Sequence, residues 1–95
     1  MELEVSSNTI VIKGNIKSIN DFQNIKQRVD AMTVENKLIN INILDSLSIT
    51  SSVIGYFNKL VLKDNIDIYM NVKNEQLLNL LEDLNLISTF KVKRS

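Results

Sequence analysis

Two kinds of apolar spacing alternate along the chain, and this alternation limits the folds it can adopt more than any other feature. Strand-like runs cover residues 3–5, 9–13, 37–44 and 66–72, and a further short run covers 90–92. Apolar residues three and four apart predict helices near 18–32, 51–62 and 74–84. The predicted order is therefore β-β-α-β-α-β-α, with a last short strand.

Strands that alternate with helices predict a mainly parallel sheet joined by right-handed crossovers. We predict an α/β fold, a single small domain with four to five strands in one mainly parallel sheet and three to four helices. The chain has no proline, two glycines and no internal repeat, so nothing marks a linker. Residues 1–95 are therefore expected to form one domain.

Polar residues mark the ends of the predicted elements. Ser18 and Asn74 are placed to cap the first and third helices, and Asn85 to end the third. The apolar stripe expected along the first helix contains Ile19, Phe22, Ile25, Val29 and Met32. The predicted core includes Ile41, Phe57, Ile68, Leu77 and Leu81.

The run at 37–44 has apolar residues on both faces of the predicted strand. Three isoleucines alternate with Asn40 and Asn42, while Leu38 and Leu44 fall on the asparagine face. A strand with both faces partly covered is expected near the centre of the sheet.

The composition argues against catalysis. The chain has no histidine and no cysteine, so it cannot build a Ser-His-Asp site, a thiolate nucleophile or a thiolate metal site. Acidic residues are scattered singly except Glu82 and Asp83, which are adjacent and diverge on a helix. We therefore expect no enzyme activity, no metal and no cofactor.

Charge and hydropathy narrow the expected partners. The charges of eleven basic and eleven acidic residues cancel, so the chain has no net positive charge that would favour binding to nucleic acid. No apolar run approaches the roughly 18 residues that span a bilayer, so no membrane insertion is expected. The first residues lack the pattern of a signal peptide, and we expect a cytoplasmic protein.

Thr50, Ser51 and Ser52 follow the predicted central strand, where the second helix begins. Short hydroxyl side chains at this position commonly accept hydrogen bonds from the free N–H groups of the first helical turn. A phosphate would also be tolerated there because the helix dipole favours negative charge. The segment is therefore either a helix cap or a modification site.

Three segments resemble the STAS family, the domain of bacterial anti-sigma factor antagonists, which is also found in transporter tails and stressosome proteins. Residues 10–17 match a strand followed by a Gly-Glu-Leu-Asp-like turn. Residues 39–42 and 49–55 match an apolar strand and the Asp-Ser-Ser-Gly segment before the second helix, and 81–86 match a late helix that ends in Gly-Leu.

The chain departs from the family pattern at five positions. Thr50 and Val53 replace the Asp and the Gly around the serines, Asn15 and Lys17 replace the acids of the first turn, and Asn42 replaces the Asp that ends the strand.

The resemblance implies a protein-binding module in a partner-switching pathway. By position, Ser51 is the serine that an anti-sigma factor kinase phosphorylates in switching members of the family. The implied protein partner is a kinase-like anti-sigma factor or a related regulator. Candidate contacts, expected to be exposed on one end or side of the second helix, are Thr50, Ser51, Ser52, Tyr56 and Lys59, although the Tyr56 ring could instead cover the edge of the core.

A second interpretation follows from the replaced acids. The chain would then be a STAS subunit that is never phosphorylated and has a fixed structural role, for example in a lipid-transport ATPase.

Overall fold

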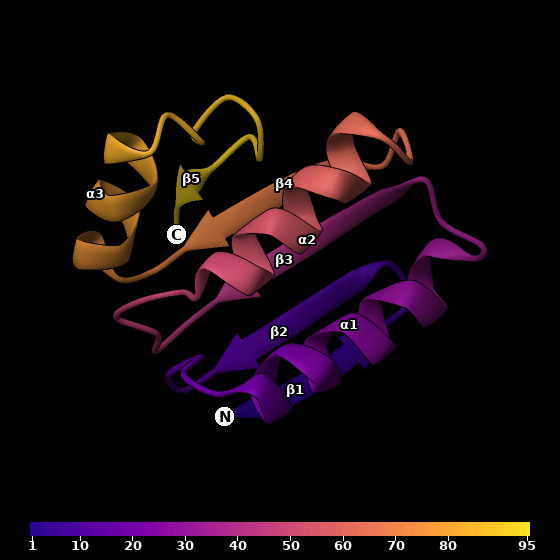
Figure 1. The fold of residues 1–95 in the computed structure, drawn as a ribbon, viewed down its shortest axis with the longest axis horizontal. Coiled ribbons are helices and arrows are strands. Elements are labelled where there is room, and N and C mark those ends of the chain that lie inside the picture. The colour runs from indigo at the N-terminus through magenta and orange to yellow at the C-terminus, as the bar shows by residue number, and fades with distance from the viewer.

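Eight elements follow one another in the computed structural model, which describes residues 1–95. They are β1 (Glu2–Ser6), β2 (Thr9–Lys13), α1 (Ile19–Thr33), β3 (Leu38–Ile43), α2 (Ser51–Leu62), β4 (Asp67–Val72), α3 (Glu75–Asp83) and β5 (Lys93–Arg94) (Figure 1). The three predicted helices and the strands at 9–13, 37–44 and 66–72 are confirmed, with small shifts at their ends.

The five strands form one sheet in the order β1-β2-β3-β4-β5, in which only β1 runs antiparallel to its neighbour. Each parallel strand is added on the same side of the previous one, so right-handed crossovers place the connecting helices on one face of the sheet. In Figure 1, α1 and α2 lie across the same face. The predicted α/β fold with a mainly parallel sheet is confirmed.

Polar side chains cap the three helices. The Ser18 hydroxyl accepts a hydrogen bond from the Asp21 amide at 3.1 Å, and the Asn74 side chain accepts one from the Leu77 amide at 3.2 Å. Asn85 follows α3 with a φ of 59°, the left-handed conformation that ends many helices. The capping roles predicted for Ser18, Asn74 and Asn85 are confirmed.

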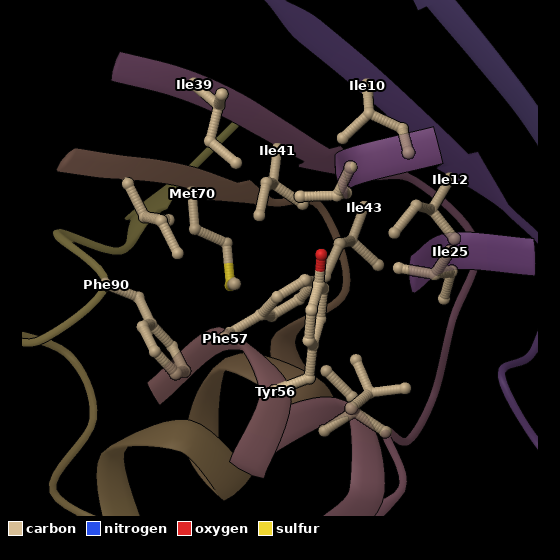
Figure 2. Packing of buried hydrophobic residues seen from close by; sticks show 14 of the residues in the cluster. Ile10, Ile12, Ile25, Ile39, Ile41, Ile43, Tyr56, Phe57, Met70 and Phe90 are labelled. Atoms are coloured by element: carbon tan, nitrogen blue, oxygen red, sulfur yellow. The ribbon is translucent and has the colours of Figure 1, made fainter. Parts of the chain in front are cut away.

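The core lies between the sheet and the helices and contains 23 buried apolar residues. Isoleucines from β2 and β3 point toward the rings of α2, and Phe57 meets Phe90 edge to face with ring centroids 6.1 Å apart (Figure 2). The residues that the sequence placed in the core are all buried, with exposed fractions of 1% or less: Ile41, Phe57, Ile68, Leu77 and Leu81.

The opposite face of the sheet is not covered, which corrects one prediction. β3 is the central strand, as expected, but Leu38 is 38% exposed and Asn40 and Asn42 are only half-buried. The side-chain amide of Asn71 donates to Asn42 Oδ1 at 2.8 Å, so two of the asparagines on this face bond across the strands. The second face stays open because all the crossovers place their helices on the other one.

Two further predictions were wrong. Residues 87–91 form a turn with Lys91 at a φ of 47°, Val92 belongs to no strand, and the last strand is β5 at Lys93–Arg94. Phe90 is not part of a strand, and its side chain is fully buried in the core. Ile19 belongs to the apolar stripe of α1 by spacing, but it is 77% exposed because it is the first residue of the helix.

Candidate functional site

The carboxyl ends of β2, β3 and β4 lie at one edge of the sheet because these strands are parallel. Three loops leave this edge, at 14–18, 44–50 and 73–74, and each leads into a helix. Loops held by a rigid scaffold are where binding residues often lie. The segment 50–52 lies at this edge, at the beginning of α2.

Two hydrogen bonds hold the loop before α2 against the loop after β2. Ser46 is fully buried and donates from its hydroxyl to the Gly14 carbonyl, and the Leu47 amide donates to Asn15 Oδ1 at 3.0 Å. Gly14 has a φ of 89°, and a Cβ there would lie 3.3 Å from the Met1 Cα, so both its conformation and its surroundings favour glycine. The loop that presents Ser51 is therefore held against the loop after β2.

The three hydroxyl residues at the beginning of α2 have different roles. Thr50 is the N-cap, and its hydroxyl accepts a hydrogen bond from the Val53 amide at 3.4 Å. Ser51 and Ser52 are exposed, and their hydroxyls form no hydrogen bond within the chain. The cap interpretation therefore holds for Thr50, whereas the two serines remain free to contact a partner.

A small hollow of about 150 Å³ lies between the first turns of α1 and α2. Its walls are Lys17, Ser18, Ile19, Phe22, Thr50 and Ser52. It combines one ammonium group, free and capping hydroxyls, and the exposed apolar side chain of Ile19. Four of these residues, from 17 to 22, were not among the predicted contacts; the only sequence signal for Ile19 was its place directly after the N-cap Ser18.

A wider and more open depression of about 470 Å³ lies at the same edge of the sheet. It is lined by Asn15, Leu44, Asp45, Leu47, Lys73 and Asn74. Leu47 is 46% exposed, so the edge carries a second accessible apolar side chain in addition to Ile19.

Tyr56 does not belong to this surface, and its predicted exposure is wrong. The side chain is 6% exposed, and its hydroxyl donates to the Asp30 carboxylate of α1. Its ring meets Phe22 edge to face at 6.1 Å, and Lys26 bridges to Asp30 at 2.8 Å. Tyr56 therefore joins α2 to α1, as the alternative interpretation of its ring suggested.

The surroundings of Tyr56 and Asp30 shift the pKa values of both side chains. Burial and the Asp30 carboxylate raise the pKa of Tyr56 well above its ordinary value. Burial alone would raise the pKa of Asp30, but hydrogen bonds from Lys26 and Tyr56 outweigh it and hold that pKa below its usual value. The hydroxyl and the carboxylate are thus kept as a neutral donor and a charged acceptor.

Lys59 is exposed but lies apart from the serines. It is eight residues further along α2, about 12 Å at the rise of a helix, and its ammonium group bridges to Asp64 at 3.1 Å. Of the five predicted contacts, the structure brings together Thr50, Ser51 and Ser52 and separates Tyr56 and Lys59.

The edge carries hydroxyl and apolar side chains but no cluster of metal ligands. No group of three or more acidic, histidine or cysteine side chains is placed to hold a metal ion. No helix has the length and apolar character that a membrane span requires. The edge offers hydroxyls that can accept a phosphate, a few polar groups and two exposed apolar side chains.

Comparison with known proteins found no matching family model, curated protein or solved structure. Any functional assignment therefore depends on the chain's own residues and their geometry.

Proposed function

We propose that the chain is a cytoplasmic protein-binding module of the partner-switching kind, similar to an anti-sigma factor antagonist. Its docking surface is the set formed by Ser51, Ser52, Ile19 and Leu47 at the carboxyl edge of the sheet. The observation that carries this proposal is the pairing of free hydroxyls with an isoleucine that is 77% exposed, at the beginnings of two helices whose preceding loops are held together by hydrogen bonds. Exposed apolar residues rimmed by polar groups are typical of protein-binding surfaces.

Phosphorylation of Ser51 would change this surface without unfolding it. Ser51 is the first residue of α2, where the helix dipole stabilises negative charge. A phosphate would add about two negative charges near the exposed side chain of Ile19. It would thereby raise the desolvation cost for any partner that binds there. The modified and unmodified forms would then differ in affinity for a kinase-like partner, with the same fold.

One observation favours the second candidate, a STAS subunit that is never phosphorylated. Two of the asparagines that replace family acids are used inside the chain, because Asn15 accepts from Leu47 and Asn42 accepts from Asn71. At these positions the side chains stabilise the loop and the sheet. A subunit with a fixed structural role needs only such contacts within the chain and no charge that phosphorylation adds and dephosphorylation removes.

Two substitutions at one position separate the candidates. The protein encoded by the neighbouring gene would be tested for capture by the wild type, by Ser51→Ala and by Ser51→Asp. Ser88→Asp is the matched control, because Ser88 is exposed in a distant turn. The intact mass of the protein from its native host would be measured in parallel.

The switch predicts that Ser51→Ala and Ser88→Asp bind like the wild type, that Ser51→Asp binds at least about tenfold more weakly, and that a phosphorylated species is found. Equal binding by all forms, with no phosphate under any growth condition, would contradict the switch and leave the fixed subunit.

A further inference from the structure

The outer edge of β1 offers backbone groups that nothing in the chain pairs. β1 is the first strand of the sheet and pairs with β2 on one side only. Leu3 lies opposite Ile12, whose carbonyl is turned toward β3 and accepts from the Leu44 amide at 2.9 Å. In an antiparallel pair of strands, two opposed residues either hydrogen-bond to each other through their backbone N–H and C=O groups, or the backbone groups of both residues point away from the partner strand. The backbone groups of Leu3, and by alternation those of Val5, therefore point outward from the sheet.

The other edge of the sheet is nearly closed. β5 has only two residues. The Val92 amide donates to Ile87 at 2.9 Å, and the Ser95 amide donates to Val72 at 3.1 Å. Of the two residues of β5, only Arg94 has backbone groups that point outward, because the Ser95 bond to Val72 shows that Lys93 faces β4. An added strand would thus find a longer ladder at β1 than at β5.

The two sides of β1 differ in charge, with acids of β1 on one side and Arg28 of α1 on the other. Glu2 and Glu4 lie on the uncovered face of the sheet, since they alternate with Leu3, which packs against the core. On the helix side, a recess of about 230 Å³ is lined by Met1, Leu3, Asn24, Gln27 and Arg28. Arg28 forms no salt bridge, and neither does Glu2, while Glu4 bridges to Lys13 at 3.1 Å.

We infer that the β1 edge binds an extended segment of another protein by strand addition. The segment has basic side chains at alternate positions, facing Glu2 and Glu4, and polar side chains between them that enter the recess beside Arg28. Main-chain hydrogen bonds to Leu3 and Val5 supply the pairing, and the acids select the segment. This surface is distinct from the docking surface around Ser51, and either one can exist without the other.

A second copy of the chain is a poor occupant of this edge. The two-fold pairing that uses all five residues of β1 is centred on Glu4 and places the two Glu4 carboxylates opposite each other. Like charges directly opposite destabilise a strand pair. The acids therefore disfavour self-pairing at this edge and favour a basic partner.

A short peptide tests the inference on the whole chain. The probe is a seven-residue peptide that alternates lysine with threonine, and its control has glutamate in place of lysine. Both are titrated to about 1 mM, a range suited to weak binding, while amide resonances and hydrogen exchange are followed by NMR. The protein variant is Glu2→Lys with Glu4→Lys, and the matched control is Glu82→Lys with Asp83→Lys on α3. Thermal melts verify that both variants fold.

The lysine peptide is expected to shift and protect the Leu3 and Val5 amides of the wild type and of the α3 control. The β1 variant should bind it about tenfold more weakly and prefer the glutamate peptide, since cross-strand charge pairs contribute modestly and their sign is reversed. Absence of shifts at β1, equal binding of both peptides, or protection of these amides by self-association without peptide would each overturn the inference.

Discussion

The first turn of α2 and its middle turns differ in what surrounds them. Ser51 and Ser52 are exposed and unbonded, whereas Tyr56 and Phe57, one turn further, are buried against α1 and the core. One helix thus carries an exposed end, which we propose as a contact surface, and a side that holds the domain together. The difference implies that stability and partner binding can be altered separately, and the predictions below test that separation.

The largest expected effect is on the buried side. Phe57→Ala removes a fully buried ring that meets both Tyr56 and Phe90, so it should lower the free energy of unfolding by about 3–5 kcal/mol. Urea denaturation would measure it. Ser52→Ala, on the same helix, is the control and should change stability by less than about 0.5 kcal/mol. Similar losses for the two variants would contradict the division between the turns of α2.

A smaller effect is expected where α2 meets α1. Tyr56→Phe removes the hydroxyl that donates to Asp30 and should lower the free energy of unfolding by about 1.5–3 kcal/mol near neutral pH, as for other hydrogen bonds to a charged group. The ring stays in place, so little of this loss comes from packing.

The cost of Tyr56→Phe should depend on pH. Folding raises the pKa of Tyr56, so its contribution is complete below the unfolded pKa of about 10 and is lost as the pH rises above it. Folding lowers the pKa of Asp30, so the contribution of the ionised carboxylate is present above about pH 4 and is lost as the pH falls further. Urea titrations of the wild type and the variant at about pH 3, 7 and 10.5 would show the largest difference at the middle value. A constant difference would contradict the assigned hydrogen bond.

Most of the fold could be predicted from the sequence because apolar spacing is decided locally. The isoleucines of β3 and the leucines of α3 recur at the period of their element, and hydroxyl or amide residues such as Ser18 and Asn74 stand where the spacing changes. The errors arose where tertiary context decides. Spacing cannot tell which face of the sheet the crossovers leave open, so Leu38 was expected to be covered. Nor can it show that the chain turns at Lys91.

The candidate site could be predicted only in part for the same reason. Thr50, Ser51 and Ser52 are adjacent in the sequence, and their place at a strand-to-helix junction was evident. Ile19 joins them only because α1 and α2 begin at the same edge of the sheet, and its apolar side chain suggested burial. Tyr56 could be placed only once its partner Asp30, 26 residues away, was known.

The central claim is that the edge around Ser51 and Ile19 binds a partner without contributing to stability. Ile19→Lys tests it most directly, with Val34→Lys as the matched control, because the two side chains are 77% and 80% exposed and lie at opposite ends of α1. The affinity of each variant for the protein captured in the pull-down with the wild type would be measured by titration, with a thermal melt of each. We expect both variants to melt within a few degrees of the wild type, and only Ile19→Lys to lose at least about tenfold in affinity. Equal affinity for the two variants would contradict the claim.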